Sequence, residues 1–222
     1  MKSERTDIKT PDALLFDMDG TLWDAVETYT KAWNTYFKKI KLDKLLSKKD
    51  LDHLMGLEER KFLEAVLPEF TAHQRALSYK QVVEIQYDLI DQQGGRIYEG
   101  VLKYIPLLSR KYKLFIISNC PKYTIDHFMK FAKINPYILD SISHGQNYKA
   151  KYQNMNRLIE KYNLRNPVYI GDTNSDLIQS RKAGIPFVFM AYGFGNCDQA
   201  DKTFTSFKDF AIYYLDETND NN

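Results

Sequence analysis

ALLFDMDGT, residues 13–21, joins a short apolar run to two acids and a glycine. A continuous apolar run of this length is typical of a strand buried on both faces, as in a parallel sheet. Alternation along the strand puts Asp17 and Asp19 on the same side, and Gly20 allows a sharp turn after them. The stretch predicts two carboxylates in one small site at a strand end. The alternative is an ordinary turn with solvated acids.

Three further apolar runs end in small, polar or acidic residues, at 114–119, 168–172 and 187–193. Helical patterns occur at 101–112, 123–132, 153–162 and 177–183. Strands that alternate with helices predict right-handed crossovers in an α/β, doubly wound parallel sheet. Ligands of such sheets bind at the carboxyl ends of the strands, where Asp17, Ser118 and Asp172 are expected.

The sequence between residues 24 and 95 has a different character. It has helical spacing, many Lys, Glu and Gln, and no strand-like run, and Gly94 and Gly95 mark its end. We expect an inserted α-helical cap domain at residues 24–95 and an α/β catalytic core made of residues 1–23 and 96–222.

The charge balance of the chain argues against nucleic acid and anionic membranes as partners. The 222 residues include 31 Lys and Arg and 29 Asp and Glu, a net charge of +2, which gives no general attraction to nucleic acid or to an anionic membrane. Two cysteines fit a reducing compartment. No apolar stretch approaches the ~20 residues that span a bilayer. We expect a cytoplasmic monomer or weak dimer with no nucleic-acid or membrane partner.

A second acidic stretch, GDTNSD at residues 171–176, also follows an apolar run. Together with the first pair of acids it offers three or four oxygens to one cation. These donors suit Mg²⁺, which keeps waters and is completed by a substrate phosphate, and the sequence has no Cys/His cluster for zinc. Because Asp172 and Asp176 are four residues apart, the alternative is that one of them is a helix N-cap.

The chain resembles the haloacid dehalogenase-like (HAD) hydrolase superfamily. Its four motifs occur here in order: Asp17-x-Asp19-Gly20-Thr21, Ser118, a lysine before the helix at 153–162, and Gly171-Asp172-x-x-x-Asp176. The helical block after the first motif is similar to the small C1 cap of phosphoglycolate-phosphatase-like members. The resemblance implies a Rossmann-like core with an inserted cap.

The resemblance also implies roles for the matching residues. Asp17 would be the nucleophile and Asp19 the general acid/base. Mg²⁺ would be held by Asp17, the Asp19 carbonyl and Asp172, with Asp176 supporting the metal site. The phosphoryl group would be held by Thr21, Ser118 and Asn119.

The motif lysine has two candidates, Lys149 and Lys151, and the proline that often follows it in the family is missing. We favour Lys151 as the catalytic lysine because it immediately precedes the helical stretch at 153–162. Lys149 would then be its solvated neighbour.

The resulting hypothesis is a Mg²⁺-dependent phosphatase that acts on a small phosphoester. In the expected cap domain, the loop at residues 55–61 is the best candidate for substrate contacts, with Arg60 or Lys61 meeting an anionic group of the substrate. An ordinary helix start with solvated charges fits this stretch equally well. One alternative is a β-phosphoglucomutase-like phosphomutase. Another is a binding protein of the same fold that has lost turnover.

Overall fold

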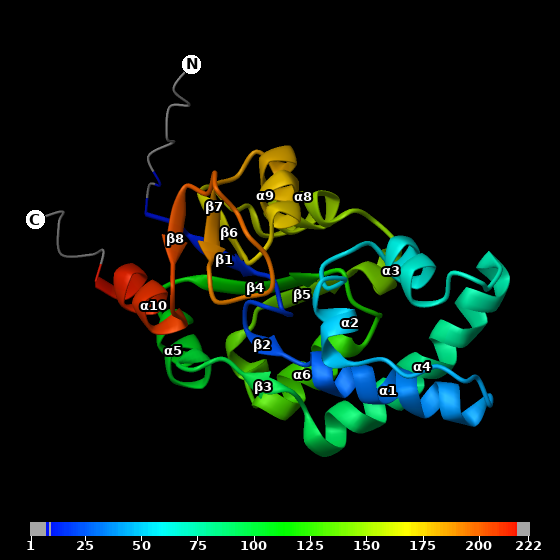
Figure 1. Ribbon diagram of the computed structural model, residues 1–222. Helices are drawn as coiled ribbons and strands as arrows, with labels where there is room; N and C mark the ends of the chain where they lie inside the picture. Colours follow the sequence, from blue (N-terminus) through cyan, green and yellow to red (C-terminus); the bar gives the residue numbers. More distant parts are fainter. Residues whose placement is uncertain (1–7, 9, 217–222) are drawn as a thin grey trace, which may run out of the picture.

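The computed structural model describes residue 8 and residues 10–216 (Figure 1). A six-stranded sheet runs through this part of the chain, and all its strand pairs are parallel. In sheet order the strands are β5 (Asp140–Ser143), β4 (Lys113–Ser118), β1 (Ala13–Phe16), β6 (Pro167–Gly171), β7 (Phe187–Met190) and β8 (Lys202–Phe204). The first strand of the chain is therefore central, with β4 and β6 as its neighbours.

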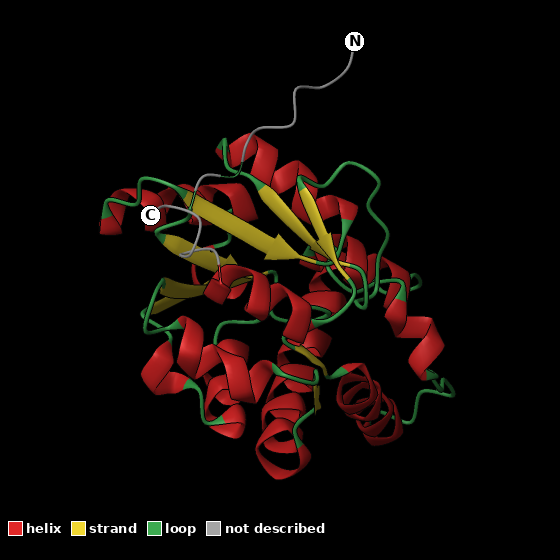
Figure 2. Ribbon diagram, turned by 90° about the vertical axis from the view of Figure 1, so that its left-hand side faces the viewer, coloured by secondary structure: helices red, strands yellow, loops and turns green. Residues whose placement is uncertain are grey.

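The sheet is covered by helices on both faces (Figures 1 and 2). Leu14 and Phe16 of β1 belong to the core shared with α5 (Val101–Leu108), α6 (Thr124–Ala132) and α10 (Phe207–Asp216). Leu15 belongs to the opposite core, which it shares with α8 (Lys151–Tyr162) and α9 (Asn174–Ala183). Successive side chains of a strand point to opposite faces, so a strand buried between two helical layers is apolar at every position.

In the sequence a block of helices is inserted between β1 and β4, and in the structure it lies beside the sheet, on the right of Figure 1. Its members are α1 (Val26–Lys39), α2 (Lys48–Asp52), α3 (Glu59–Val66) and α4 (Ala72–Gln93). The chain enters through β2 (Trp23–Asp24) and leaves through β3 (Arg96–Ile97), and these two short strands pair antiparallel. The two connections of the block are thus held together at one place.

The structure confirms the predicted fold class, a parallel α/β sheet with inserted helices. The residue boundaries 24–95 of a separate cap domain stay a prediction. Several elements were not predicted from the sequence: the short paired strands β2 and β3, the strands β5 and β8 of the sheet, α10, a short α7 (His144–Asn147) and a 3₁₀ turn (Asn135–Tyr137). β5 and β8 lie at the edges of the six-stranded sheet, where residues are only partly buried, so neither forms the continuous apolar run that marks a central strand. None of the helices in the described part is long and apolar enough to cross a membrane.

Candidate active site

The end of β1 carries the first two acids into the site. The backbone N–H of Asp17 donates to the carbonyl of Ile170 (2.8 Å), so pairing with β6 continues one residue beyond the strand. Asp17 is buried and Asp19 is half-buried. The next residue, Gly20, has a φ of +83°, and a Cβ there would lie 2.1 Å from Oδ2 of Asp172. The turn therefore requires glycine both for its conformation and for its close approach to that carboxylate.

A buried lysine lies between two of the aspartates. Nζ of Lys151 is 3.1 Å from Oδ2 of Asp17 and 2.7 Å from Oδ1 of Asp176, and the lysine is only 3% exposed. Burial opposes the charge, but the two carboxylates outweigh it and raise the pKa of Lys151. The lysine is therefore a fixed positive charge. Lys149, the other candidate, is exposed.

Three buried carboxylates form a cluster: Asp17, Asp172 and Asp176 each contribute one oxygen, and these oxygens lie within 4.8 Å of one another. Oδ1 of Asp17 is buried and has no hydrogen-bond partner among the described residues. Like charges this close together, away from water, are costly unless a cation joins them. A hard oxygen donor set with an unpartnered carboxylate oxygen fits Mg²⁺.

The two later acids of the cluster have different surroundings. Asp172 accepts hydrogen bonds from the backbone N–H of Phe194 (2.7 Å) and from the hydroxyl of Thr21 (3.4 Å). Asp176 has both oxygens occupied, because Oδ1 pairs with Lys151 and Oδ2 accepts from the N–H (3.1 Å) and the hydroxyl (2.6 Å) of Thr173. The N-cap of α9 is Thr173, so neither aspartate is the cap residue that the spacing left open.

Burial changes the protonation of the cluster. It raises the pKa of Asp17 to about 6, against the opposing charge of Lys151. It also raises the pKa of Asp172 well above the ordinary value, and the nearby charges of Asp176 and Asp17 add to this effect. Lys151 balances only part of the negative charge of the three carboxylates, so a further cation would reduce the repulsion that remains.

Asp19 points to a different side of the site. Its Oδ1 accepts a hydrogen bond from the hydroxyl of Tyr29 in α1 (2.9 Å). Burial raises the pKa of Asp19 to about 7, and the hydrogen bond from Tyr29 opposes that rise. A carboxyl with this pKa can both give and take a proton near neutral pH.

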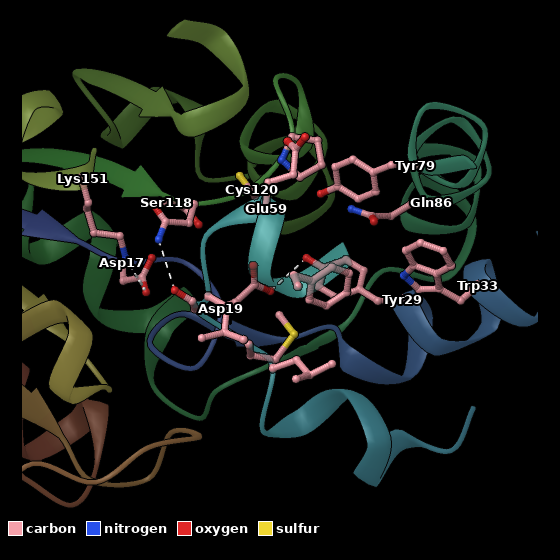
Figure 3. A pocket seen from close by; sticks show the side chains of 17 residues that line it. Asp17, Asp19, Tyr29, Trp33, Glu59, Tyr79, Gln86, Ser118, Cys120 and Lys151 are labelled. Atoms are coloured by element: carbon pink, nitrogen blue, oxygen red, sulfur yellow. Dashed lines mark hydrogen bonds and ion pairs between the residues drawn. The ribbon is translucent and has the colours of Figure 1, made fainter. Parts of the chain in front are cut away.

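One pocket joins these groups to the helical block (Figure 3). Its inner end is lined by five residues that the sequence analysis selected: Asp17, Asp19, Ser118, Asn119 and Lys151. Its outer end is lined by side chains of the block, among them Tyr29, Trp33, Glu59, Phe62, Tyr79 and Gln86. In Figure 3, Trp33, Tyr79 and Gln86 point from their helices towards the aspartates. The pocket therefore has a charged inner end and a mainly aromatic outer end.

The loop before α3 closes one wall of the pocket. Met55, Gly56 and Leu57 line it, and Nδ2 of Asn119 donates to the carbonyl of Gly56 (3.2 Å). Gly56 has a φ of +78°, and a Cβ there would meet nothing nearer than Cγ2 of Thr173 at 3.6 Å. The glycine is needed here for its backbone conformation and not for close approach.

Two predicted substrate contacts do not line the pocket. Thr21 is fully buried, and its hydroxyl donates to Asp172. The side chain of Arg60 is 87% exposed and pairs with Glu64 (3.0 Å), one turn further along α3. The expectation that Arg60 faces the substrate is not met, because its side chain lies on the solvent side of the helix.

Polar side chains of the helical block that were not selected individually from the sequence also line the pocket: Tyr29, Glu59, Tyr79 and Gln86. Glu59 precedes the buried Leu63 by four positions and Val66 by seven, which places it on the inward face of α3. Tyr29 and Trp33 are also four positions apart and share one face of α1. These spacings are visible in the sequence, but the spacing alone does not show which face of a helix meets the pocket.

Comparison with known proteins bears on the whole arrangement. A sequence model of haloacid dehalogenase-like hydrolases matches residues 14–190, which include both acidic stretches and the helical block. The chain belongs to the haloacid dehalogenase-like hydrolase family. This confirms the family and the hydrolase class expected from the four motifs. Among curated proteins, none matches the sequence of this family member significantly.

Solved structures of family members share the fold of this haloacid dehalogenase-like hydrolase. A predicted phosphoglycolate phosphatase from Haemophilus somnus is 18% identical, with a TM-score of 0.81 over 93% of this chain and 99% of that chain. A haloacid dehalogenase-like hydrolase from Streptococcus pneumoniae is 20% identical, with a TM-score of 0.76 over 92% and 99%. A mutant of CbbY from Rhodobacter sphaeroides, solved with xylulose-(1,5)bisphosphate, is 15% identical, with a TM-score of 0.78 over 93% and 99%. At these identities the likeness is one of fold.

Proposed function

We propose that the protein is a Mg²⁺-dependent phosphatase that hydrolyses a small phosphorylated metabolite through an aspartyl-phosphate. The observation that carries the proposal is the environment of Asp17. This buried aspartate has one oxygen against Lys151 and the other without a partner among the described residues, and it lines a pocket together with Asp19. A nucleophile, a fixed cation and a proton donor thus meet at one point.

In the first step Asp17 attacks phosphorus, and the bond between phosphorus and the leaving oxygen breaks. Lys151 balances the negative charge of the nucleophile and of the phosphoryl oxygens. Ser118 and Asn119 line the same end of the pocket and have hydrogen-bond donors for those oxygens. Asp176 keeps Lys151 in position through the 2.7 Å ion pair.

Asp19 moves the protons of both steps. It protonates the leaving oxygen in the first step and then takes a proton from the water that hydrolyses the aspartyl-phosphate. Its pKa of about 7 suits this double task near neutral pH. The hydroxyl of Tyr29 fixes the orientation of the carboxyl group.

The metal would be held by Asp17, Asp172 and the backbone carbonyl of Asp19, with Asp176 behind them. Bound Mg²⁺ would supply charge neutralisation and polarisation of the phosphoryl oxygens. The donor set described above, with no Cys or His in the cluster, supports this choice.

The geometry favours hydrolysis over phosphomutase activity. A mutase must hold a bisphosphate, whose second phosphate needs its own cations. Lys151 is the one cationic side chain among the described residues that line the pocket, and it is already paired with two carboxylates. A silent binding protein is also disfavoured, since the candidate nucleophile and acid/base are both present.

The test is a panel of small phosphomonoesters assayed with purified protein and Mg²⁺. We expect release of inorganic phosphate, its loss on exhaustive EDTA treatment, and its return with Mg²⁺. Asp17→Asn should abolish both turnover and the phosphorylated enzyme that is detected after acid quenching. Asp126→Asn changes an exposed aspartate outside the pocket and should have no effect. Wild-type turnover in Asp17→Asn would refute the proposal.

A further inference from the structure

The outer end of the pocket restricts the leaving group of the substrate. Four aromatic side chains from three helices meet there: Tyr29, Trp33, Phe62 and Tyr79. Trp33 lies at the centre, with the ring of Tyr79 nearly parallel to it (17°, centroids 6.3 Å apart) and the ring of Phe62 tilted (centroids 6.1 Å apart). Aromatic rings gathered in this way attract cations through the negative potential of their faces.

The charge of the outer end is negative. Glu59 lines it, is half-buried, and makes no ion pair with any described residue. Burial raises the pKa of Glu59, and the imidazole of His144, which does not line the pocket, opposes that rise. A carboxylate in this position gains most from a positive group placed within the pocket.

The described residues place no cationic side chain at the outer end of the pocket that could bind an anionic leaving group. Lys151 is the single cationic side chain that the described residues contribute to the lining, and it lies at the inner end against Asp17 and Asp176. Arg60, the expected anion contact, faces solvent. A second carboxylate or phosphate on the substrate would therefore meet Glu59 without compensation.

We propose that the leaving group carries a cationic nitrogen, an ammonium or alkylammonium, which Glu59 and the surrounding aromatic rings bind. The inference rests on the proposed phosphatase function and specifies its substrate class: a phosphomonoester of an amino alcohol. In the reaction the ester bond to the amino alcohol breaks, the leaving oxygen takes the proton of Asp19, and water later releases inorganic phosphate from Asp17. The products are the free amino alcohol and phosphate.

The first test compares substrates that differ only in charge. Phosphocholine and 3,3-dimethylbutyl phosphate have the same shape, and phosphoethanolamine and propyl phosphate form a second pair. We expect kcat/KM to favour the cationic member of at least one pair about tenfold, and to be lowest for phosphoglycolate. Glu59→Gln should reduce the ratio within the pair to about one. Glu58→Gln is the matched control, since Glu58 is exposed, does not line the pocket, and should leave the ratio unchanged.

Two further measurements separate this inference from the proposed function. If the protein hydrolyses p-nitrophenyl phosphate with Mg²⁺ but prefers neither cationic ester, the inference is overturned and the phosphatase proposal stands. If it hydrolyses no ester, calorimetric binding of the same two pairs decides. Tighter binding of a cationic ester that is lost in Glu59→Gln then supports the inference although the phosphatase proposal fails. Equal binding of both members, or none, overturns it.

Discussion

The two lysines at the start of α8 differ sharply in their surroundings. Lys151 is buried between two carboxylates, whereas Lys149 is exposed. If Lys151 neutralises the nucleophile and the phosphoryl oxygens, Lys151→Ala should lower kcat roughly 10²- to 10³-fold. Lys149→Ala should leave it within about twofold. Steady-state kinetics of both variants, with circular dichroism to verify folding, provide the test, and a larger loss at Lys149 would contradict the assignment.

The hydroxyl of Tyr29 is a second feature whose effect can be isolated. Its hydrogen bond to Asp19 lowers a pKa that burial raises to about 7. In Tyr29→Phe the pKa of Asp19 should rise further, by up to about one unit for a hydrogen bond worth ~1 kcal/mol. The limb of the pH–kcat profile that reports Asp19 should then move to higher pH.

Tyr36 offers a matched control in the same helix. It is also buried, and its hydroxyl donates to Ser78 (2.8 Å) instead of to the site. Tyr36→Phe should leave the pH profile unchanged. A profile that moves equally in both variants would show that the effect comes from loss of helix stability and not from Asp19.

At the scale of elements, the paired connections β2 and β3 fix where the helical block joins the sheet. Gly95, just before β3, lies so close to the other connection that a Cβ would be 2.8 Å from both Cα of Ala25 and the carbonyl oxygen of Asp24. These are backbone atoms and have little room to move. Gly95→Ala should therefore separate the two connections and lower the free energy of unfolding by about 1–3 kcal/mol.

Urea unfolding measures this prediction directly. Gln92→Ala is the control, since Gln92 is exposed near the end of α4 and its change should stay within about 0.5 kcal/mol. Gly95→Ala with wild-type stability would mean that the connections adjust freely, and that their pairing does not fix the position of the block.

At the scale of the whole molecule, the buried acids should make folding depend on pH and on a bound cation. Asp17 and Asp19 have pKa values of about 6 and 7 in the folded protein, against an ordinary value of 3.8. The folded state therefore holds more protons than the unfolded state between about pH 4 and pH 7. Without a divalent cation, the stability that these groups contribute is present at low pH and is lost as the pH rises through this window.

Mg²⁺ should offset this loss, because it binds the ionised carboxylates of the folded state only. We expect an increase in Tm on adding Mg²⁺ that is larger at pH 8 than at pH 5, equivalent to about 2.7 kcal/mol at a hundredfold excess over Kd. Asp172→Asn should lose most of the increase. Scanning calorimetry with EDTA and with Mg²⁺ at both pH values is the measurement; an increase of the same size at both would contradict the link.

Much of the fold could be predicted because buried strands are visible in the sequence as continuous apolar runs. A strand covered on both faces must be apolar at every position, and β1, β4, β6 and β7 are buried along almost their whole length. Polar residues at the carboxyl ends of such strands must share one edge of a parallel sheet, so Asp17, Ser118 and Asp172 could be predicted to lie near one another. Edge strands such as β8 have no such apolar run because their residues are only partly buried.

By itself, the sequence determined the family, the sheet, and the acids at the strand ends. Only the tertiary structure decided which residues of the helical block face the pocket. Adjacent residues of a helix point about 100° apart. Once Leu63 and Val66 pack into the core, Glu59 turns inward and Arg60 turns to solvent. Glu59 and Arg60 are neighbours in α3, and local helix propensity does not determine which of them faces the pocket. Packing sets the rotation of the helix, and it places the negative charge of Glu59 at the pocket instead of the positive charge of Arg60.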